Sequence, residues 1–472
     1  MSPLASGERR VRLRASGHYR GRGPSPAHRG PGEGRAMGHL VGKDVYRQLG
    51  RKIDGLAARA PWNEKLRAIL EELYSKEDAE LVIRMPYGLS RLGRLERVTG
   101  IPRTTLERQL ESLCPRGLVV DLCIREEYWY APSPMVIGIF EFTMMRTGAG
   151  TDSRTWAGLF QDYLDEGAFY ARNFDAGQKV APLRTVPHEG AVRPEEHVEV
   201  LDYERATAIV ESSDRFAMGL CSCRHEKHHL GEKRCAAPLD NCSSFGVAAD
   251  FLVRNRLARE VSKTEMLENL ARSREFGLVF NADNVQRNVT FMCHCCGCCC
   301  NVLLGITRHG FPNTVVTSSY IAGSDRDRCL GCGKCSKRCP VGALPRVADT
   351  DPRFRKHGRP QIDERICIGC GVCTLTCNPG AMKLHARAQR VLHPETTFER
   401  VLLQSLERGT LQNQLFDNPE SKTQDFLRAV VGGFLRLAPV KRALMSDALR
   451  SRFLASMKGG ASAQGKRNLV DL

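Results

Sequence analysis

The arrangement of the cysteines constrains this chain more than any other feature of its sequence. Eighteen of the 20 cysteines lie between Cys221 and Cys377. Within that segment the spacing C-x2-C-x2-C-x3-C occurs twice, first at Cys329, Cys332, Cys335 and Cys339 and then at Cys367, Cys370, Cys373 and Cys377. No stretch has the apolar pattern of an export signal, so the thiols predict metal or redox chemistry rather than disulfides.

The repeated motif resembles the cluster-binding sequence of bacterial two-cluster ferredoxins. Pro340 follows the first copy directly, as in the ferredoxin pattern, whereas the proline of the second copy is delayed by one position to Pro379. The connection VADTDPRFRKHGRPQIDE is longer than a minimal ferredoxin needs, and we expect it to form a surface loop. Neither departure removes a cysteine.

The resemblance implies two [4Fe–4S] clusters with crossed ligand sets. Two intervening residues let a tight loop bring three thiolates to one face of a cube, whereas the fourth cysteine binds the other cube. The expected ligands are Cys329, Cys332, Cys335 and Cys377 for the first cluster, and Cys367, Cys370, Cys373 and Cys339 for the second. Structural zinc in two four-thiolate sites is the alternative, but it does not explain the three-plus-one repeat.

A second, less regular group of thiols lies upstream. The run CHCCGCCC at residues 293–300 offers the three-ligand spacing at Cys293, Cys296 and Cys299, with Cys295 and Cys298 as an offset pair and Cys300 left over. A companion segment carries Cys221, Cys223, Cys235 and Cys242. We expect these two segments together to hold one or two further iron–sulfur clusters, with ligands drawn from both.

Other readings of the upstream thiols remain open. Zinc is a rival, bound by the companion cysteines or by the histidines between them, His225, His228 and His229. Disulfides are disfavoured because adjacent cysteines bridge only with strain. Arg224, next to Cys223, suits a charge-assisted hydrogen bond to a thiolate or an anionic ligand, or lies at the surface.

The order of these features resembles a wider set of multi-cluster ferredoxin-type iron–sulfur proteins of anaerobic bacteria. In these a helical region precedes a C-x-C-R…C…C segment, a C-x-C-C-x-C-C-C run and a two-cluster ferredoxin domain. The resemblance covers nearly everything after Met37. It implies electron transfer inside a larger oxidoreductase system, with redox partner proteins and no indicated substrate.

The sequence predicts an α+β protein built from several units. They are a disordered head (1–36), a helical, winged-helix-like domain (37–133), a helical connector (134–200), a Cys-rich cluster-binding domain (201–322), a βαββαβ two-cluster ferredoxin domain (323–386), and amphipathic helices with a loose tail (387–472). The head carries eight arginines against two glutamates and little to bury, so the functional chain is expected to start near Met37.

Three helix starts can be predicted from capping residues. Ser75 and Ser262 each begin a capping box, and the second helix is expected to form a wall beside the cysteines. Thr396 caps a further helix that Gly409 should end. Cys114 and Cys123 have no cysteine partner at metal-binding spacing, so we expect them to pack as ordinary side chains.

The charge balance does not by itself indicate a nucleic-acid partner. The formal net charge is +17, but part of it lies in the head, and basic residues elsewhere can offset anionic clusters. Glu107 and Glu111 on the presumed recognition helix would repel phosphates. No run of about 18 apolar residues is present that would span a membrane.

We therefore expect a cytoplasmic iron–sulfur electron carrier. The sequence features favour a non-catalytic carrier or oxidoreductase subunit over an enzyme. No dinucleotide-binding motif or P-loop is recognisable, so electrons should pass through partner proteins or an unrecognised bound cofactor. Two alternatives remain. One is a redox-sensing DNA-binding regulator, and the other is a reductase with a site-differentiated cluster that binds substrate.

Overall fold

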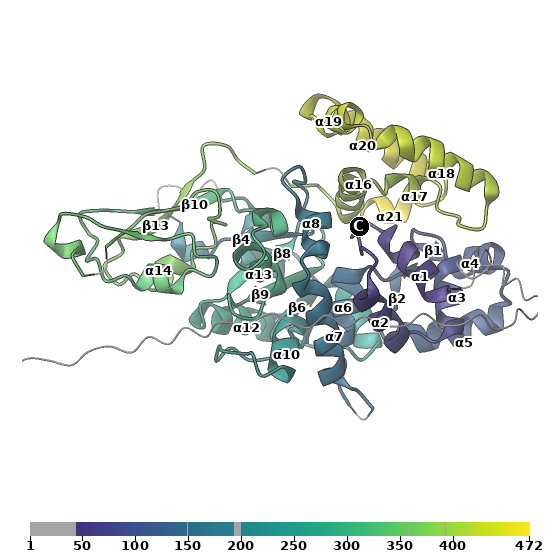
Figure 1. The fold of residues 1–472 in the computed structure, drawn as a ribbon, viewed down its shortest axis with the longest axis horizontal. Helices are drawn as coiled ribbons and strands as arrows, with labels where there is room; N and C mark the ends of the chain where they lie inside the picture. Colours follow the sequence, from purple (N-terminus) through teal and green to yellow (C-terminus); the bar gives the residue numbers. More distant parts are fainter. Residues whose placement is uncertain (1–43, 149, 193–199, 357, 392) are drawn as a thin grey trace, which may run out of the picture. The chain divides into compact units, whose positions relative to one another are not determined.

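The computed structural model describes residues 44–148, 150–192, 200–356, 358–391 and 393–472. The chain divides into two compact units, residues 1–44 and 45–472, and the elements below belong to the second. The predicted head and the start expected at Met37 lie outside the described residues. Helices and strands are interspersed along the second unit, in agreement with the predicted α+β class (Figure 1).

The first part of this unit is a helical layer with a small antiparallel sheet. Its elements are α1 (Val45–Asp54), α2 (Glu64–Leu73), α3 (Lys76–Arg84), β1 (Ser90–Arg91), α4 (Leu92–Thr99), α5 (Arg103–Leu113), β2 (Val119–Ile124) and β3 (Glu127–Pro132). The strands lie in the order β1-β3-β2. Arg125 and Glu126 have positive φ angles, which allow a two-residue turn between β2 and β3. The capping box at Ser75 is confirmed.

Three helices follow, α6 (Phe140–Met145), α7 (Ser153–Asp165) and α8 (Ala168–Phe174). Their aromatic side chains, including Phe160 and Tyr163, complete the core of the first part. Residues 183–186 then form strand β4 (Leu183–Val186), so the helical connector predicted for 134–200 contributes a strand to the sheet that follows. A strand of four residues is too short to be told from a helix by periodicity.

A six-stranded antiparallel sheet occupies the middle of the chain. Its order is β4-β8-β9-β6-β5-β7, formed by β5 (Phe216–Gly219), β6 (Cys242–Phe245), β7 (Ala258–Glu260), β8 (Val279–Asp283) and β9 (Phe291–Cys295) with β4. Helices connect these strands or follow the last of them. They are α9 (Ala206–Glu211), α10 (Ser222–His229), α11 (Gly246–Arg254), α12 (Lys263–Glu275) and α13 (Asn301–Thr307). Strand ends and helix starts therefore carry the upstream cysteines.

Helix α12 supports the sheet through one buried amide side chain. The predicted capping box at Ser262 and Glu265 is present. Further along the helix, Asn269 donates to the backbone oxygen of Asn241 at 3.3 Å and to Oγ of Ser243 at 3.1 Å. Both acceptors lie at the start of β6, so α12 holds the strand that begins with a cysteine.

The ferredoxin-like region, residues 320–386, has two small antiparallel strand pairs. The element order is β10 (Tyr320–Ser324), α14 (Lys334–Arg338), β11 (Arg346–Val347), β12 (Arg359–Pro360), α15 (Val372–Leu375) and β13 (Met382–Ala386). Strand β10 pairs with β13, and β11 pairs with β12. This is a strand-helix-strand-strand-helix-strand sequence, in which each helix starts inside a cysteine motif.

The long connection between the two cysteine motifs packs back onto the first of them. Phe354 is buried, and the guanidinium group of Arg353 donates to the backbone oxygens of Arg326 and Asp327 at 3.3 and 3.0 Å. The sequence predicted a surface loop here. Much of it is exposed, but its 3-10 turn (Pro352–Phe354) anchors it beside the first cysteine loop.

The C-terminal helices form a separate apolar cluster, drawn in yellow-green (Figure 1). They are α16 (Thr397–Arg408), α17 (Leu411–Leu415), α18 (Lys422–Leu435), α19 (Ala438–Met445), α20 (Asp447–Ala463) and α21 (Arg467–Val470). Thr396 caps α16, and Gly409 ends it in the left-handed conformation, both as predicted.

The tail expected to be loose, residues 458–468, is helical through Ala463, and Lys466 pairs with Asp417 at 3.0 Å. Leu469 is only 7% exposed and packs with Ile124 and Trp129 on the small sheet. Asn468 accepts a hydrogen bond of 2.8 Å from Arg125. The residues before Leu469 have low hydrophobicity, so the sequence did not indicate that Leu469 and Val470 would be buried. Within the described residues, no helix combines the length and apolar content needed to cross a bilayer.

We expect Ser262→Ala to loosen the start of α12, because the alanine cannot accept the N–H hydrogen bond of Glu265. Loss of such a cap costs about 1 kcal/mol, which corresponds to about fivefold faster hydrogen exchange of the first-turn amides. Exchange measured by mass spectrometry checks this. Thr264→Ala, at an exposed position of the same turn, is the control, and equal exchange in both variants would contradict the capping role.

Candidate metal centres

The four thiols expected to bind the first ferredoxin cluster line one pocket. They are Cys329, Cys332, Cys335 and Cys377. Three come from the loop that runs into α14, and the fourth follows α15. Cys332 is exposed, and Leu330 beside it is 65% exposed, so this pocket lies at the protein surface.

The four thiols expected to bind the second cluster lie deeper. Cys367, Cys370 and Cys373 are buried, and Cys339 joins the same apolar cluster. Burial, and then the charge of the neighbouring thiolates Cys339 and Cys367, raises the pKa of Cys370. The first four of these eight thiols, hereafter the ferredoxin thiols, thus line one pocket, and the second four lie in an apolar cluster that also contains Cys335 and Cys377.

The delayed proline after Cys377 leaves the environment of its sulfur intact. The backbone N–H of Ala343 donates to Sγ of Cys339 at 3.2 Å, four residues along the chain. In the second copy Met382 donates to Sγ of Cys377 at 3.3 Å, five residues along. The donor in the second copy therefore lies one position further along the chain, and both sulfurs keep an N–H···S bond that favours the thiolate.

Glycine is required where each cysteine loop passes another part of the backbone. Gly331 and Gly369 occupy equivalent places in CLGC and CIGC and have φ angles of 62° and 68°. A Cβ atom at Gly331 would overlap the backbone oxygen of Arg353, and one at Gly369 would overlap that of Tyr320. The donor set, the N–H···S bonds and these close approaches all fit [4Fe–4S] clusters.

The ten upstream thiols separate into two neighbouring groups. The first, hereafter the quartet, consists of Cys235, Cys296, Cys298 and Cys299. The second, hereafter the six-thiol group, consists of Cys221, Cys223, Cys242, Cys293, Cys295 and Cys300. Cys293, Cys296 and Cys299, which have the three-ligand spacing, fall into different groups.

The six-thiol group forms where strands end and helices begin. Cys242 opens β6, Cys293 and Cys295 lie on one face of β9, and Cys221 and Cys300 directly precede α10 and α13. Within this group Cys242 is electrostatically coupled to Cys293, Cys293 to Cys295, Cys295 to Cys300, and Cys300 to Cys223. The members Cys293, Cys295 and Cys300 share an apolar cluster with the ferredoxin thiols.

Arg224 is completely buried between the two upstream groups. Its Nη1 donates to the backbone oxygen of Pro238 and to Oδ1 of Asn241, both at 2.6 Å, and its Nη2 donates to the backbone oxygen of His294 at 2.8 Å. Nη2 also lies 3.9 Å from Sγ of Cys296. The expectation that Arg224 serves a thiolate is therefore consistent with its position, and the surface alternative is wrong.

Two carboxylates near the six-thiol group were missed in the sequence, the half-buried Glu141 and the buried Glu226. Burial raises the pKa of Glu141 to about 7 and that of Glu226 to about 7. Glu141 accepts from the N–H of Gly138 at 3.0 Å, and Glu226 accepts from Asn301 at 2.8 Å. A single charge inside the apolar run MVIGIFEF was the signal that could have identified Glu141.

The histidines proposed as alternative metal ligands are engaged elsewhere. Nε2 of His225 lies 2.8 Å from Nε2 of His229, and Nδ1 of His225 lies 2.7 Å from the backbone oxygen of Met144. Among the described residues, the compact ligand group contains cysteines and no histidine. Cys114 is buried in the first core, as expected of a packing thiol, and Cys123 is half-buried.

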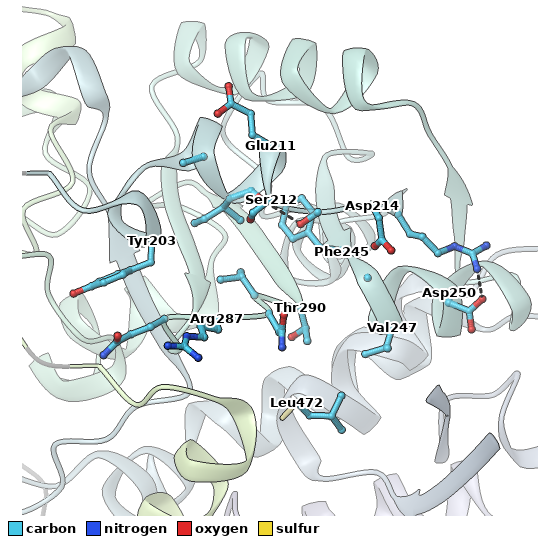
Figure 2. A pocket seen from close by; sticks show the side chains of 18 of the residues that line it. Tyr203, Glu211, Ser212, Asp214, Phe245, Val247, Asp250, Arg287, Thr290 and Leu472 are labelled. Atoms are coloured by element: carbon cyan, nitrogen blue, oxygen red, sulfur yellow. Dashed lines mark hydrogen bonds and ion pairs between the residues drawn. The ribbon is translucent and has the colours of Figure 1, made fainter. Parts of the chain in front are cut away.

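A cleft of about 1180 Å³ lies on the sheet away from the thiol groups (Figure 2). It reaches Phe245, the last residue of the strand that starts at Cys242. Its charged groups largely neutralise one another, as where Arg215 contacts Asp250 at 3.2 Å. The lining therefore indicates no particular ligand.

Comparison with known proteins identifies one region of the chain. Residues 328–381 match the family model of the 4Fe-4S dicluster domain, which indicates that this region binds 4Fe-4S clusters. The match spans both copies of the cysteine motif. No curated protein and no solved structure matches the chain.

We expect Gly369→Ala to impair cluster assembly, because the added Cβ would displace the loop from Tyr320. Iron and acid-labile sulfide per chain, measured after anaerobic purification, should fall by about half of the ferredoxin complement. Gly342→Ala is the matched control, since Gly342 has a φ of 71° but open space around it. If both variants lost equal amounts of iron and sulfide, backbone strain would be the cause rather than the close approach of Gly369 to Tyr320.

Proposed function

We propose that this protein transfers single electrons through two ferredoxin-type [4Fe–4S] clusters and one further iron–sulfur centre, as a component of a larger oxidoreductase system. The observation that carries the proposal is the grouping of the eight ferredoxin thiols inside the region that matches the dicluster domain. When bound, such clusters accept and donate one electron at a time without rearranging the protein.

The residues around the two ferredoxin sites determine how far each site is exposed to solvent. Cys332 and Leu330 place the first ferredoxin site at the surface, where a redox partner can approach it. The thiols of the second site are buried among apolar side chains such as Ile368 and Val372, which exclude water. We propose that electrons enter or leave at the first site and pass inward to the second.

The second site lies against the upstream thiols. A Cβ atom added to Gly297, within CHCCGCCC, would lie 2.8 Å from the backbone oxygen of Pro340, the residue after Cys339. Cys295 and Cys300 pack in the same apolar cluster as Cys367 and Cys370. Because the second ferredoxin site and the six-thiol group share one apolar cluster, we propose a third centre in the six-thiol group. Electrons would pass to it from the ferredoxin sites.

The two alternative functions are less well supported. Arg103 pairs with Glu107 at 3.0 Å on the exposed face of α5, and Arg125 in the strand turn contacts Asn468 of the C-terminal segment, so these two basic residues already have partners within the chain. For a reductase, the carboxylates Glu141 and Glu226 supply groups that can carry protons. Neither the cleft in Figure 2 nor the pocket at the first ferredoxin site is lined by these carboxylates or by the six-thiol group.

The iron content of the full chain tests the proposal. Anaerobically purified protein should contain about twelve iron atoms with equimolar acid-labile sulfide, and dithionite should give paramagnetic resonance signals of several reduced clusters. Cys370→Ser should lower the iron content by about four, whereas Cys123→Ser, at a half-buried cysteine outside all groups, should not change it.

Two results would count against different parts of this proposal. About eight iron atoms per chain would remove the third centre and leave the ferredoxin relay intact. A colourless chain with zinc in the ferredoxin sites and no reducible centre would end the electron-transfer function altogether.

A further inference from the structure

The quartet differs in spacing from every other thiol group that the structure describes. Its sulfur atoms all lie within 4.8 Å of one another. The Sγ–Sγ distances are 3.5 Å for Cys235–Cys296, 4.0 Å for Cys235–Cys299, 3.8 Å for Cys296–Cys298 and 3.5 Å for Cys298–Cys299. Among the described residues, the ferredoxin thiols form no group of this compactness.

This spacing matches a single tetrahedral ion. Zinc–thiolate bonds are about 2.3 Å long, which places the four sulfurs of a tetrahedron about 3.8 Å apart. In a [4Fe–4S] cube each thiolate binds a different iron, and sulfides lie between the irons, so the thiolates must stand farther apart. The quartet is too compact to surround a cube.

The alternatives without metal fit less well. The shortest sulfur distance is 3.5 Å, far beyond the 2.03–2.05 Å of a disulfide, and two quartet members are adjacent in sequence. Four thiolates this close would repel one another unless a cation lay between them.

The local packing also favours a bound ion. The small apolar cluster here has seven members, of which Ala237, Leu278 and Phe276 are the only ones that are not quartet cysteines. Residues 230–241, which carry Cys235, contain no helix or strand. A bound ion would join this irregular segment to the turn after β9, which the N–H of Cys300 closes onto the oxygen of Cys296 at 3.2 Å.

Buried positive charge provides a second, independent observation. Arg224 is 0% exposed, and its hydrogen-bond acceptors at Pro238, Asn241 and His294 are all neutral. A buried cation without an anionic neighbour is costly. Four thiolates around a divalent ion carry a net charge of about −2, and Nη2 of Arg224 lies 3.9 Å from one of them.

We propose that Cys235, Cys296, Cys298 and Cys299 bind one structural zinc ion that is separate from the iron–sulfur centres. Binding displaces the thiol protons to solvent and changes no oxidation state. All four positions are filled by the protein, so the site has no place for substrate and serves to fix residues 230–241 beside the six-thiol group. The proposal does not depend on the electron-transfer function.

Metal analysis of the full chain, purified anaerobically without an immobilised-metal step, tests the proposal. We expect about one zinc per chain, and X-ray absorption at the zinc edge should show four sulfur neighbours at about 2.3 Å. In Cys298→Ser/Cys299→Ser, zinc should fall at least about tenfold while iron and sulfide from the ferredoxin sites remain.

Control variants separate this result from the electron-transfer proposal. Cys370→Ser should lose iron and keep zinc, and Cys123→Ser should keep both. The inference is overturned by absence of zinc, by nitrogen or oxygen neighbours at the zinc edge, or by loss of iron and sulfide instead of zinc in the double variant. Recovery of a disulfide among the four cysteines in the unmodified, oxygen-protected chain would overturn it as well. The absorption measurement needs no variant, so a misfolded variant does not leave the question open.

Discussion

The structure depends on compensating the charge of thiolates that lie close together inside an apolar interior. Eighteen cysteines gather between residues 221 and 377, and many of them contact other cysteines. An uncompensated thiolate in such surroundings is costly, so the packing requires positive charge from metal ions, N–H groups or a buried cation. The N–H···S bonds of Ala343 and Met382 and the position of Arg224 all serve this need.

The division of the upstream thiols follows from where one strand ends. Cys293 and Cys295 are two residues apart on β9, so they point to the same face and join the six-thiol group. After Cys295 the backbone leaves the strand and turns, and Cys296, Cys298 and Cys299 face the segment that carries Cys235. One run of eight residues thereby supplies cysteines to two separate thiol groups, which is the gain from placing so many thiols together.

Much of the architecture could be predicted because it rests on local rules. The capping residues at Ser75, Ser262 and Thr396 identify helix starts, since the hydrogen bonds involved span only three residues. The strand β4 and the docked end at Leu469 could not be predicted in this way. Both are stabilised by partners about a hundred or more residues away, which local periodicity does not reveal.

The sequence by itself determined the ferredoxin-like chemistry, because the spacing of each cysteine motif is sufficient to wrap three thiolates around one cluster. Only the tertiary structure decided how the upstream thiols group, because their spacing allows several registers. It placed Cys235 beside three cysteines more than 60 positions later, and it buried Arg224 between both groups. Sheet pairing and loop packing set those distances, and neither is encoded in the spacing of the residues along the chain.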